Sequence, residues 1–371
     1  MTARPNLRIV VIAPLRFPIR RPHAGGLESA VWNEVHQLRA RGHEVTLIAP
    51  EGSDGAAITI PGLTWPTGSR PTDDSYPPSY LDRSVPALDR ALDVIAATPE
   101  HFDVISNHCL HGLPLQRAGE LGVPMVSTLH TPVDDDLVHA HASATGYRSS
   151  FLSVSEFTRR EWAAAGVTSS VLPNAVDPIA WPLGPGGSDL VWFGRIVPEK
   201  APHLAIEVAE RLGRRLIIAG RIGDADYAER FVLPRVGADV RYIGQLAPHE
   251  LAALVGRSAC SIATPVWDEP FGLVAPEALM CGTPVASFAV GGVAEIAGAS
   301  FGMATAPRLD TEILAERAAG LIEQAENDAT FRPSIRDQAR TRFALPARID
   351  ALERHFAAVI DDHAVVRERA A

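Results

Sequence analysis

The segment GRIVPEK (194–200) places two cations, Arg195 and Lys200, close together after a predicted strand. Lys200 is the only lysine among the 34 basic residues of the chain; all the others are arginines. A compact ammonium group persists in such a chain most readily where a planar guanidinium cannot replace it. The pair could clamp a diphosphate. The alternative is a surface ion pair with Glu199.

A second segment, DEPFGLVAPE (268–277), holds Glu269 and Glu277 on either side of an apolar, glycine-containing turn. The flanking residues predict a strand before this turn and a helix after it, with Pro276 in the first helical turn. Glu277 would then lie where the helix dipole favours a carboxylate even without a ligand. A pair of glycosidase carboxylates is a further alternative, but it would not explain the two cations.

The loop HAGGLES (23–29) follows the first predicted strand and opens the first predicted helix. The backbone N–H groups of Gly25 and Gly26 could therefore approach an anion at the start of that helix. Because a Gly-Gly pair is often only a turn, this signal is weak by itself.

The elements that must position these residues alternate between strand and helix. The apolar run 7–14 predicts a strand buried on both faces of a parallel sheet, 27–40 predicts an amphipathic helix, and 41–50 returns to a strand. Residues 52–86 predict an irregular connection. Further strands are expected at 102–108, 124–130 and 149–155.

The segment 171–189 is rich in proline and glycine, as expected of a connection between domains, and the strand–helix alternation restarts after it. A chain of 371 residues is long enough for two domains. The predicted fold is α/β, with two Rossmann-like, doubly wound parallel-sheet domains facing a central cleft. The expected ranges are 1–172, 173–345, and a C-terminal helix, 346–371, that packs back towards the first domain.

Composition excludes several classes of protein. A net charge of −10 gives nucleic acid no broad basic surface to bind. Cys109, Cys260 and Cys281 lack the spacing of a disulfide framework or a zinc site. The first apolar run breaks at Arg16, so no targeting signal is expected, and we expect a cytoplasmic protein.

Together these motifs resemble the retaining glycosyltransferases of the GT-B-fold group usually called family 4. The resemblance covers nearly the whole chain in order. It departs from the usual pattern at Ala175 and Ala201, where the family more often has glycine. The motifs that carry it are GGLE (25–28), TLHT (128–131), VSEFTRR (154–160), PNAVD (173–177), GRIVPEK (194–200), YIGQL (242–246), EPFGLVAPEAL (269–279), CGTPV (281–285) and GGVAE (291–295).

The resemblance implies a role for each site residue. Arg195 and Lys200 would hold the diphosphate of a nucleotide-sugar donor, and Glu277 would accept hydrogen bonds from the ribose. His130 would face the donor sugar and the acceptor, although a buried histidine at a strand end is the alternative. The other implied contacts are Glu269 with the amides of Phe271, Gly272 and Leu273 for the sugar, Ile243, Gly244 and Leu246 for the nucleobase, and Gly25 and Gly26 for the phosphates and the acceptor side.

The implied reaction transfers a sugar with retention by a front-face mechanism, without a metal or another cofactor. A UDP-sugar is the favoured donor, GDP-mannose is possible, and a soluble small molecule or oligosaccharide is the expected acceptor. Association with a membrane is not expected. The run Asp134–Asp136 matches a metal-binding DxD pattern of another glycosyltransferase fold, but we expect it to hold no metal. A nucleotide-sugar epimerase and a non-catalytic nucleotide-sugar binding protein remain as alternatives.

Overall fold

The computed structural model describes residues 6–370, with side chains through residue 365. Residues 1–5 and 371, which the predicted domain ranges include, lie outside this part. The chain forms two compact units. The first contains the residues up to Pro66, Tyr76–Pro173 and the chain from Pro346; the second contains Thr67–Ser75 and Asn174–Leu345. Sequence analysis assigned Thr67–Ser75 to the first domain, whereas the structure groups this segment with the second unit.

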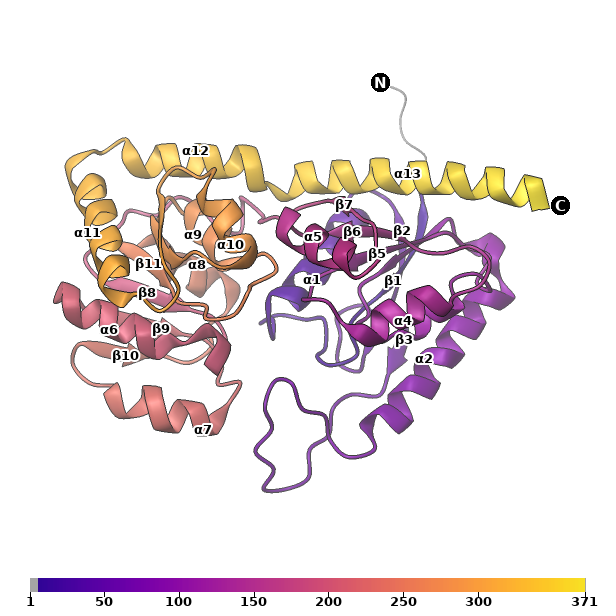
Figure 1. Ribbon diagram of the computed structural model, residues 1–371, viewed down its shortest axis with the longest axis horizontal. Helices are drawn as coiled ribbons and strands as arrows, with labels where there is room; N and C mark the ends of the chain where they lie inside the picture. The colour runs from indigo at the N-terminus through magenta and orange to yellow at the C-terminus, as the bar shows by residue number, and fades with distance from the viewer. Residues whose placement is uncertain (1–5, 371) are drawn as a thin grey trace. The chain divides into compact units, whose positions relative to one another are not determined.

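The first unit is built on a parallel sheet, which has seven strands within the described residues (Figure 1). Its strand order is β3-β2-β1-β4-β5-β6-β7. Residues Ile9 to Ile12 of β1 are completely buried, as the continuous apolar run predicts for a central strand. The strands are β1 (Arg8–Ile12), β2 (Glu44–Pro50), β3 (Ile58–Ile60), β4 (Val104–Asn107), β5 (Met125–Leu129), β6 (Ser150–Ser153) and β7 (Ser170–Val171).

The longer helices of the first unit bury one face. In α1, Val31, Val35 and Leu38 are buried at helical spacing, and the helix lies against β2. The prediction of an irregular segment over 52–86 is wrong in part, because this range contains β3 and the start of α2. The helices are α1 (Gly26–Ala40), α2 (Tyr80–Ala97), the 3₁₀ turn η1 (Pro99–His101), α3 (Leu113–Arg117), α4 (Asp135–Ser143), α5 (Glu156–Ala164) and α13 (Leu345–Ala370).

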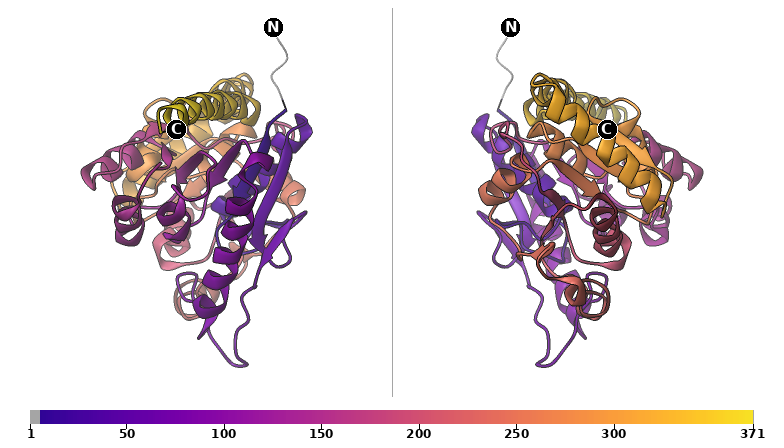
Figure 2. Two further views of the ribbon diagram at one scale, coloured as in Figure 1. Left: turned by 90° about the vertical axis from the view of Figure 1, so that its right-hand side faces the viewer. Right: turned by 90° about the vertical axis from the view of Figure 1, so that its left-hand side faces the viewer.

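The second unit repeats this architecture with a parallel sheet in the order β10-β9-β8-β11-β12-β13. All four residues of β8 are buried. Helix α11 lies against β12 and β13 (Figure 2). The strands are β8 (Leu190–Phe193), β9 (Leu216–Ala219), β10 (Val240–Tyr242), β11 (Cys260–Ala263), β12 (Val285–Phe288) and β13 (Met303–Ala306). The helices are α6 (Pro202–Leu212), α7 (Ala225–Tyr227), α8 (Pro248–Gly256), α9 (Val274–Met280), α10 (Gly291–Ala297), α11 (Thr311–Asn327) and α12 (Phe331–Phe343), with the short turns η2 (Pro198–Lys200), η3 (Ala228–Val232) and η4 (Leu233–Arg235).

Each sheet has a topological switch point, where successive strands are added on opposite sides. In the first sheet it lies between β1 and β4, and in the second between β8 and β11. Ligands of doubly wound sheets bind beyond the carboxyl ends of the strands at such points. The prediction of two doubly wound α/β domains is confirmed. Among the described helices, none is both long enough and apolar enough to cross a bilayer.

Candidate active site

The unique lysine lies in a short turn that is fastened to the neighbouring strand end. Lys200 is the last residue of η2, which follows β8. The hydroxyl of Thr264, just beyond β11, donates to the carbonyl oxygens of Lys200 and Ala201 at 3.1 and 2.9 Å. The amide of Val266 donates to the carbonyl of Glu199 at 2.9 Å. These bonds fix the backbone of Lys200 at the switch point of the second sheet.

The side chain of Lys200 is paired with Glu269. Its ammonium group donates to both carboxylate oxygens of Glu269. The indole N–H of Trp267 donates to Glu269 at 3.1 Å, and the ammonium nitrogen lies 5.4 Å from the centre of the Trp267 ring. Sequence analysis gave Lys200 to a diphosphate and Glu269 to a sugar; the structure adds that these two groups are direct partners.

The turn that carries Glu269 depends on two glycines. Gly272 has φ of +92°, and a Cβ atom there would lie 2.7 Å from Val293. A Cβ atom on Gly291 would lie 2.3 Å from the carbonyl oxygen of Glu269, which accepts a bond from the amide of Gly292 at 2.7 Å. A side chain at either glycine would therefore displace the turn.

The same turn presents free backbone donors. Among the described residues, the amides of Phe271, Gly272 and Leu273 donate to no backbone or side-chain acceptor. They precede α9, whose first N–H groups have no partner within the helix. The three amides that the resemblance assigns to a sugar are therefore available for hydrogen bonds.

Arg195 is held by two carboxylates. It donates to Asp73 at 2.7 Å and to Glu199 at 3.4 Å, so the ion pair considered as an alternative in the sequence is present. Arg221, which follows β9, donates to both oxygens of Asp73 at 2.7 and 2.6 Å. Burial acts to raise the pKa of Asp73, but Arg221 and Arg195 outweigh it and hold the pKa below its usual range. Sequence analysis missed Asp73, because it lies 122 positions from Arg195 and its segment has no motif.

Glu277 lies in the first turn of α9, as predicted, and is half-buried. Burial raises the pKa of its carboxyl group to about 8. A hydroxyl group or a cation that donates a hydrogen bond to this carboxyl group would stabilise its ionised form.

The residues predicted to lie near a nucleobase follow β10. Ile243 is 41% exposed, and Gly244 has φ of +76°. The carbonyl of Gly244 accepts a bond from the amide of Gly220 at 2.8 Å, which joins the loops after β10 and β9. Leu246 is half-buried in the same loop. The structure thus places these residues at the carboxyl end of the second sheet, as it does Arg195 and Lys200.

His130 follows the carboxyl end of β5 in the first unit and is half-buried. Its Nε2 atom lies 2.9 Å from Nδ1 of His108, and Nε2 of His108 lies 3.0 Å from Oε1 of Glu34. The guanidinium of Arg348 donates to Oε2 of Glu34 at 3.2 Å. We call Glu34, His108, His130 and Arg348 the histidine cluster. Sequence analysis found only His130.

Two members of the histidine cluster, Glu34 and His130, have shifted pKa values. Burial would raise the pKa of Glu34, but His108, Arg348 and Ser106 hold it well below its usual range, so Glu34 is ionised. Burial, with help from His108 and Arg348, lowers the pKa of His130 well below its usual value, although Glu34 opposes this. The imidazole of His130 is therefore neutral at neutral pH.

The glycine loop and the aspartate run both lie at helix starts. Gly25 is the N-cap of α1, and Gly26 is its first residue. Asp134 is the N-cap of α4 and accepts a hydrogen bond from the amide of Leu137 at 3.1 Å. In the part of the chain that the structure describes, no group of three or more histidine, cysteine, aspartate or glutamate side chains is arranged to hold a metal ion.

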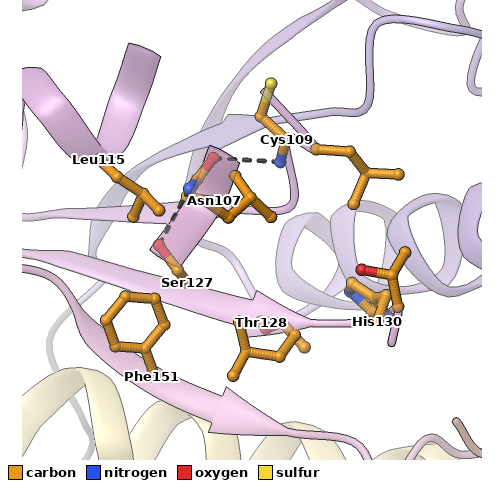
Figure 3. A pocket seen from close by; sticks show the side chains of 11 residues that line it. Asn107, Cys109, Leu115, Ser127, Thr128, His130 and Phe151 are labelled. Atoms are coloured by element: carbon orange, nitrogen blue, oxygen red, sulfur yellow. Dashed lines mark hydrogen bonds between the residues drawn. The ribbon is translucent and has the colours of Figure 1, made fainter. Parts of the chain in front are cut away.

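A small cavity adjoins His130 (Figure 3). Its volume is about 10 Å³, room for about one water molecule and not for a sugar. Asn107 donates to Ser127 at 2.9 Å in its wall. Cys109, which also lines it, is a buried free thiol whose pKa is raised by burial to about 12, so it is no nucleophile at neutral pH.

Comparison with known families gives the class of the protein. Residues 24–179 match the family described as Glycosyltransferase Family 4, and residues 182–342 match the family described as Glycosyl transferases group 1. The two matched ranges together cover most of the chain, which therefore belongs to the glycosyltransferase group 1/family 4 glycosyltransferases. The matched ranges contain every described strand of both sheets except β1, and they contain both strands that flank the switch point of the second sheet.

Individual relatives are more distant. The chain is 34% identical over 151 residues to a glycogen synthase of Mycobacterium tuberculosis, a match that spans 38% of this chain and only 36% of that enzyme's length. It is 27% identical over 338 residues to a D-inositol 3-phosphate glycosyltransferase of Mycolicibacterium smegmatis, covering 77% of this chain and 76% of the relative. The crystal structure of HepE from Anabaena in complex with UDP and glucose is 18% identical, with a TM-score of 0.71 over 95% of this chain and 100% of that one. This last likeness confirms the predicted GT-B fold.

Proposed function

We propose that this protein is a retaining glycosyltransferase that moves a sugar from a nucleotide-diphosphate sugar to a hydroxyl group of an acceptor. The observation that carries the proposal is the Lys200–Glu269 pair at the switch point of the second sheet. Departure of a nucleoside diphosphate from a sugar develops negative charge, which fixed cations stabilise. The sugar must also be oriented by a group beside those cations. In the pair, Lys200 supplies the cation and Glu269 the orienting group.

In the proposed donor site, Arg195 and Lys200 bind the diphosphate. Glu269 and the free amides of Phe271, Gly272 and Leu273 bind the sugar hydroxyls. Glu277 accepts hydrogen bonds from the ribose, which would stabilise its ionised form against the burial that raises its pKa. Ile243, Gly244 and Leu246 contact the base. Gly25 and Gly26 contact the phosphates and the acceptor side.

The proposed chemistry is a front-face displacement with retention. The departing phosphate oxygen takes the proton of the acceptor hydroxyl, so that the glycosidic bond forms on the face from which the diphosphate leaves. This mechanism requires no enzymic nucleophile, and Glu269, already bound to Lys200, acts as a positioning group for the sugar. His130 supplies a neutral imidazole towards the reacting sugars.

We propose a UDP-sugar as donor, because HepE, which shares the fold, binds UDP and glucose in its crystal structure. GDP-mannose is the second choice. The name of the Mycolicibacterium smegmatis relative gives a small polar acceptor, D-inositol 3-phosphate, which supports a small-molecule or oligosaccharide acceptor here.

A thermal-shift panel with UDP, GDP, ADP and dTDP tests the donor. Binding to the folded protein at about 100 times the dissociation constant stabilises it by about 2.7 kcal/mol. UDP is expected to give the largest shift, and a larger shift with GDP would replace the UDP assignment. Sugar transfer is then measured with the matching nucleotide-sugar. Isomerisation of the sugar without an acceptor would identify an epimerase, and binding without transfer or hydrolysis would identify a non-catalytic binding protein.

A further inference from the structure

A second cavity lies in the second unit, and none of the residues proposed for the donor lines it. Its volume is about 390 Å³, which is in the usual range of small-molecule sites. It adjoins the turn η2, which carries Lys200, through Pro198 alone. The lining residues are Pro198, His203, Asp224, Asp226, Tyr227, Arg230 and Phe231.

Three aromatic rings form one wall of this cavity. The centre of the Phe231 ring lies 5.6 Å from that of His203 and 5.4 Å from that of Tyr227, and the last two centres are 5.7 Å apart. Nδ1 of His203 also lies 2.6 Å from the hydroxyl oxygen of Tyr227. Tyr227 is buried, whereas Phe231 is 39% exposed. Phe231 is therefore the ring of this wall that a ligand can cover most fully.

The turn that carries Phe231 is unusual. η3 is a turn of π-helix, a form that is rare and occurs frequently at functional sites. It lies against α6, from which His203 comes, and it also carries Arg230. The guanidinium of Arg230 lies 5.1 Å from the centre of the Phe231 ring, and among the described residues it pairs with no carboxylate. Its N–H groups are free to bind a ligand beside the ring.

Carboxylates supply the acceptors. Asp224 accepts the amide of Tyr227 at 2.9 Å, and Asp226 pairs with Arg70 at 2.7 Å. A carboxylate has about four acceptor sites, so both groups can accept further hydrogen bonds, whereas Arg230 only donates. An anionic ligand would be repelled by the two carboxylates and a cationic one by Arg230. A neutral ligand with hydroxyl groups suits both, because a hydroxyl donates and accepts.

The ring geometry excludes a nucleobase held between two rings. Two rings that enclose a planar base must be parallel and about 7 Å apart, twice the usual contact distance of carbon atoms. Here the rings already contact one another, and their planes are inclined by 36° to 72°. The wall can therefore cover a ligand on one side only. A sugar ring has an apolar C–H face for such a wall and hydroxyl groups at its edge for the charged side chains.

We propose that this cavity is a second carbohydrate site, which binds a neutral hexopyranose with its C–H face on Phe231 and its hydroxyl groups on Arg230, Asp224 and Asp226. The site is separate from the proposed donor site and does not depend on the proposed function. In a saccharide of several units, it adds binding affinity through a sugar that takes no part in transfer.

Fluorine NMR can observe this site directly. The chain has 12 phenylalanines, so protein labelled with 4-fluorophenylalanine gives few signals, and that of Phe231 is assigned by its loss in Phe231→Leu. Phe301 is the internal control, because it is 44% exposed in the same unit and lies outside the cavity. The probes are the methyl α-glycosides of glucose, mannose and galactose, with adenosine and choline as a neutral nucleoside and an organic cation.

We expect at least one glycoside to shift the Phe231 signal saturably, with a dissociation constant on the order of 1 mM, and to leave the Phe301 signal unchanged. Arg230→Met should weaken this binding by about tenfold, through loss of hydrogen bonds from the guanidinium. Arg211→Met, at an exposed position of α6, should not. The proposal is overturned if no glycoside shifts Phe231, if adenosine or choline binds more tightly there, or if both arginine variants behave alike.

A measurement on the sugar itself gives a second, independent readout. Saturation transfer from the protein to the ring C–H protons of the bound glycoside should fall in Phe231→Leu and persist in Phe301→Leu; equal transfer in both variants would contradict the stacking role of Phe231. Lys200→Met should leave the Phe231 titration unchanged. If UDP fails to bind the unmodified protein, the proposed function fails, while the titration of Phe231 still decides the carbohydrate site.

Discussion

Asp73 accepts hydrogen bonds from both Arg195 and Arg221, so that one carboxylate joins the guanidinium groups that follow β8 and β9. A diphosphate that binds Arg195 must compete with this carboxylate. We therefore expect Asp73→Asn to strengthen UDP binding, measured by calorimetry, by about fivefold. Asp226→Asn, which alters an exposed ion pair with Arg70, is the control and should change nothing. Weaker binding by Asp73→Asn would show instead that Asp73 holds Arg195 in its binding geometry.

Lys200 offers a direct test of the diphosphate site. Lys200→Met should weaken UDP binding by about 2 kcal/mol, because hydrogen bonds to charged groups contribute about this much. Lys200→Arg should restore little of it, since a planar guanidinium does not replace a compact ammonium. Arg317→Met, on the exposed side of α11, is the charge-matched control.

The single lysine also permits chemical labelling. Apart from the N-terminus, Lys200 is the only amine that an acylating reagent can modify. We expect bound UDP to protect it and acylation to abolish UDP binding, both followed by mass spectrometry and titration. Full labelling with unchanged affinity would remove Lys200 from the proposed site.

Glu277 should make nucleotide binding depend on pH. Below a pH of about 8 its carboxyl group is largely protonated in the free protein. If ribose hydroxyls donate to the ionised form, affinity should rise as pH approaches that value from below, by up to about tenfold per pH unit. Glu277→Gln should lose this part of the dependence, and the titration of the nucleotide itself, common to both proteins, cancels in the comparison.

Glu277 should also make the stability of the fold depend on pH. Its pKa is raised from 4.5 to about 8, so the folded protein binds the proton more tightly than the unfolded chain does. This contribution is fully present below the unfolded pKa and is lost as pH rises towards about 8. The difference in unfolding free energy between the unmodified protein and Glu277→Gln should change in that direction; a constant difference would contradict the pKa shift.

Ala201 has a left-handed backbone conformation, with φ of 44° and ψ of 53°. An alanine in this region costs about 1 kcal/mol relative to glycine. Ala201→Gly should therefore raise the free energy of unfolding in urea by about that amount. Ala319→Gly, at an exposed position inside α11, should lower it by about 1 kcal/mol. Destabilisation by both variants would contradict the strain at Ala201.

Sugar transfer should persist at its full rate in excess EDTA. Arg195 and Lys200 supply positive charge to the proposed diphosphate site, and Asp134, the first residue of the DxD-like run, is engaged as the cap of α4. Assays in EDTA, with and without added Mg²⁺ or Mn²⁺, check this expectation. A strict requirement for either ion would overturn it.

Local patterns were sufficient to predict the central strands of both parallel sheets, but not the edge strands β3, β7 and β13. The run 7–14 is apolar because β1 is covered on both faces, and α1 has a buried stripe at helical spacing. The turn in DEPFGLVAPE (268–277) was located correctly for a similar reason, since it lies between a predicted strand and a predicted helix. Segment 52–86 failed because β3 has only three residues and proline and glycine surround it.

Partners far apart in the chain could not be predicted. Glu34 has the pattern of a surface helix residue, yet it is buried because Ser106, His108 and Arg348, from two other segments, surround its carboxylate. Asp73 lies in a connection whose composition indicates only a loop. Such contacts depend on packing between elements, for which a single sequence contains no periodic signal.

The position of Arg348 on α13 has a consequence for synthesis. The carboxylate of Glu34 is formed early in translation, but the cation that balances its charge follows 314 residues later. Until then the nascent first unit contains a buried charge without its counter-ion, an arrangement that is strongly destabilising. The first unit should therefore become fully stable only after the second has left the ribosome, so that the order of maturation is the reverse of the order of synthesis.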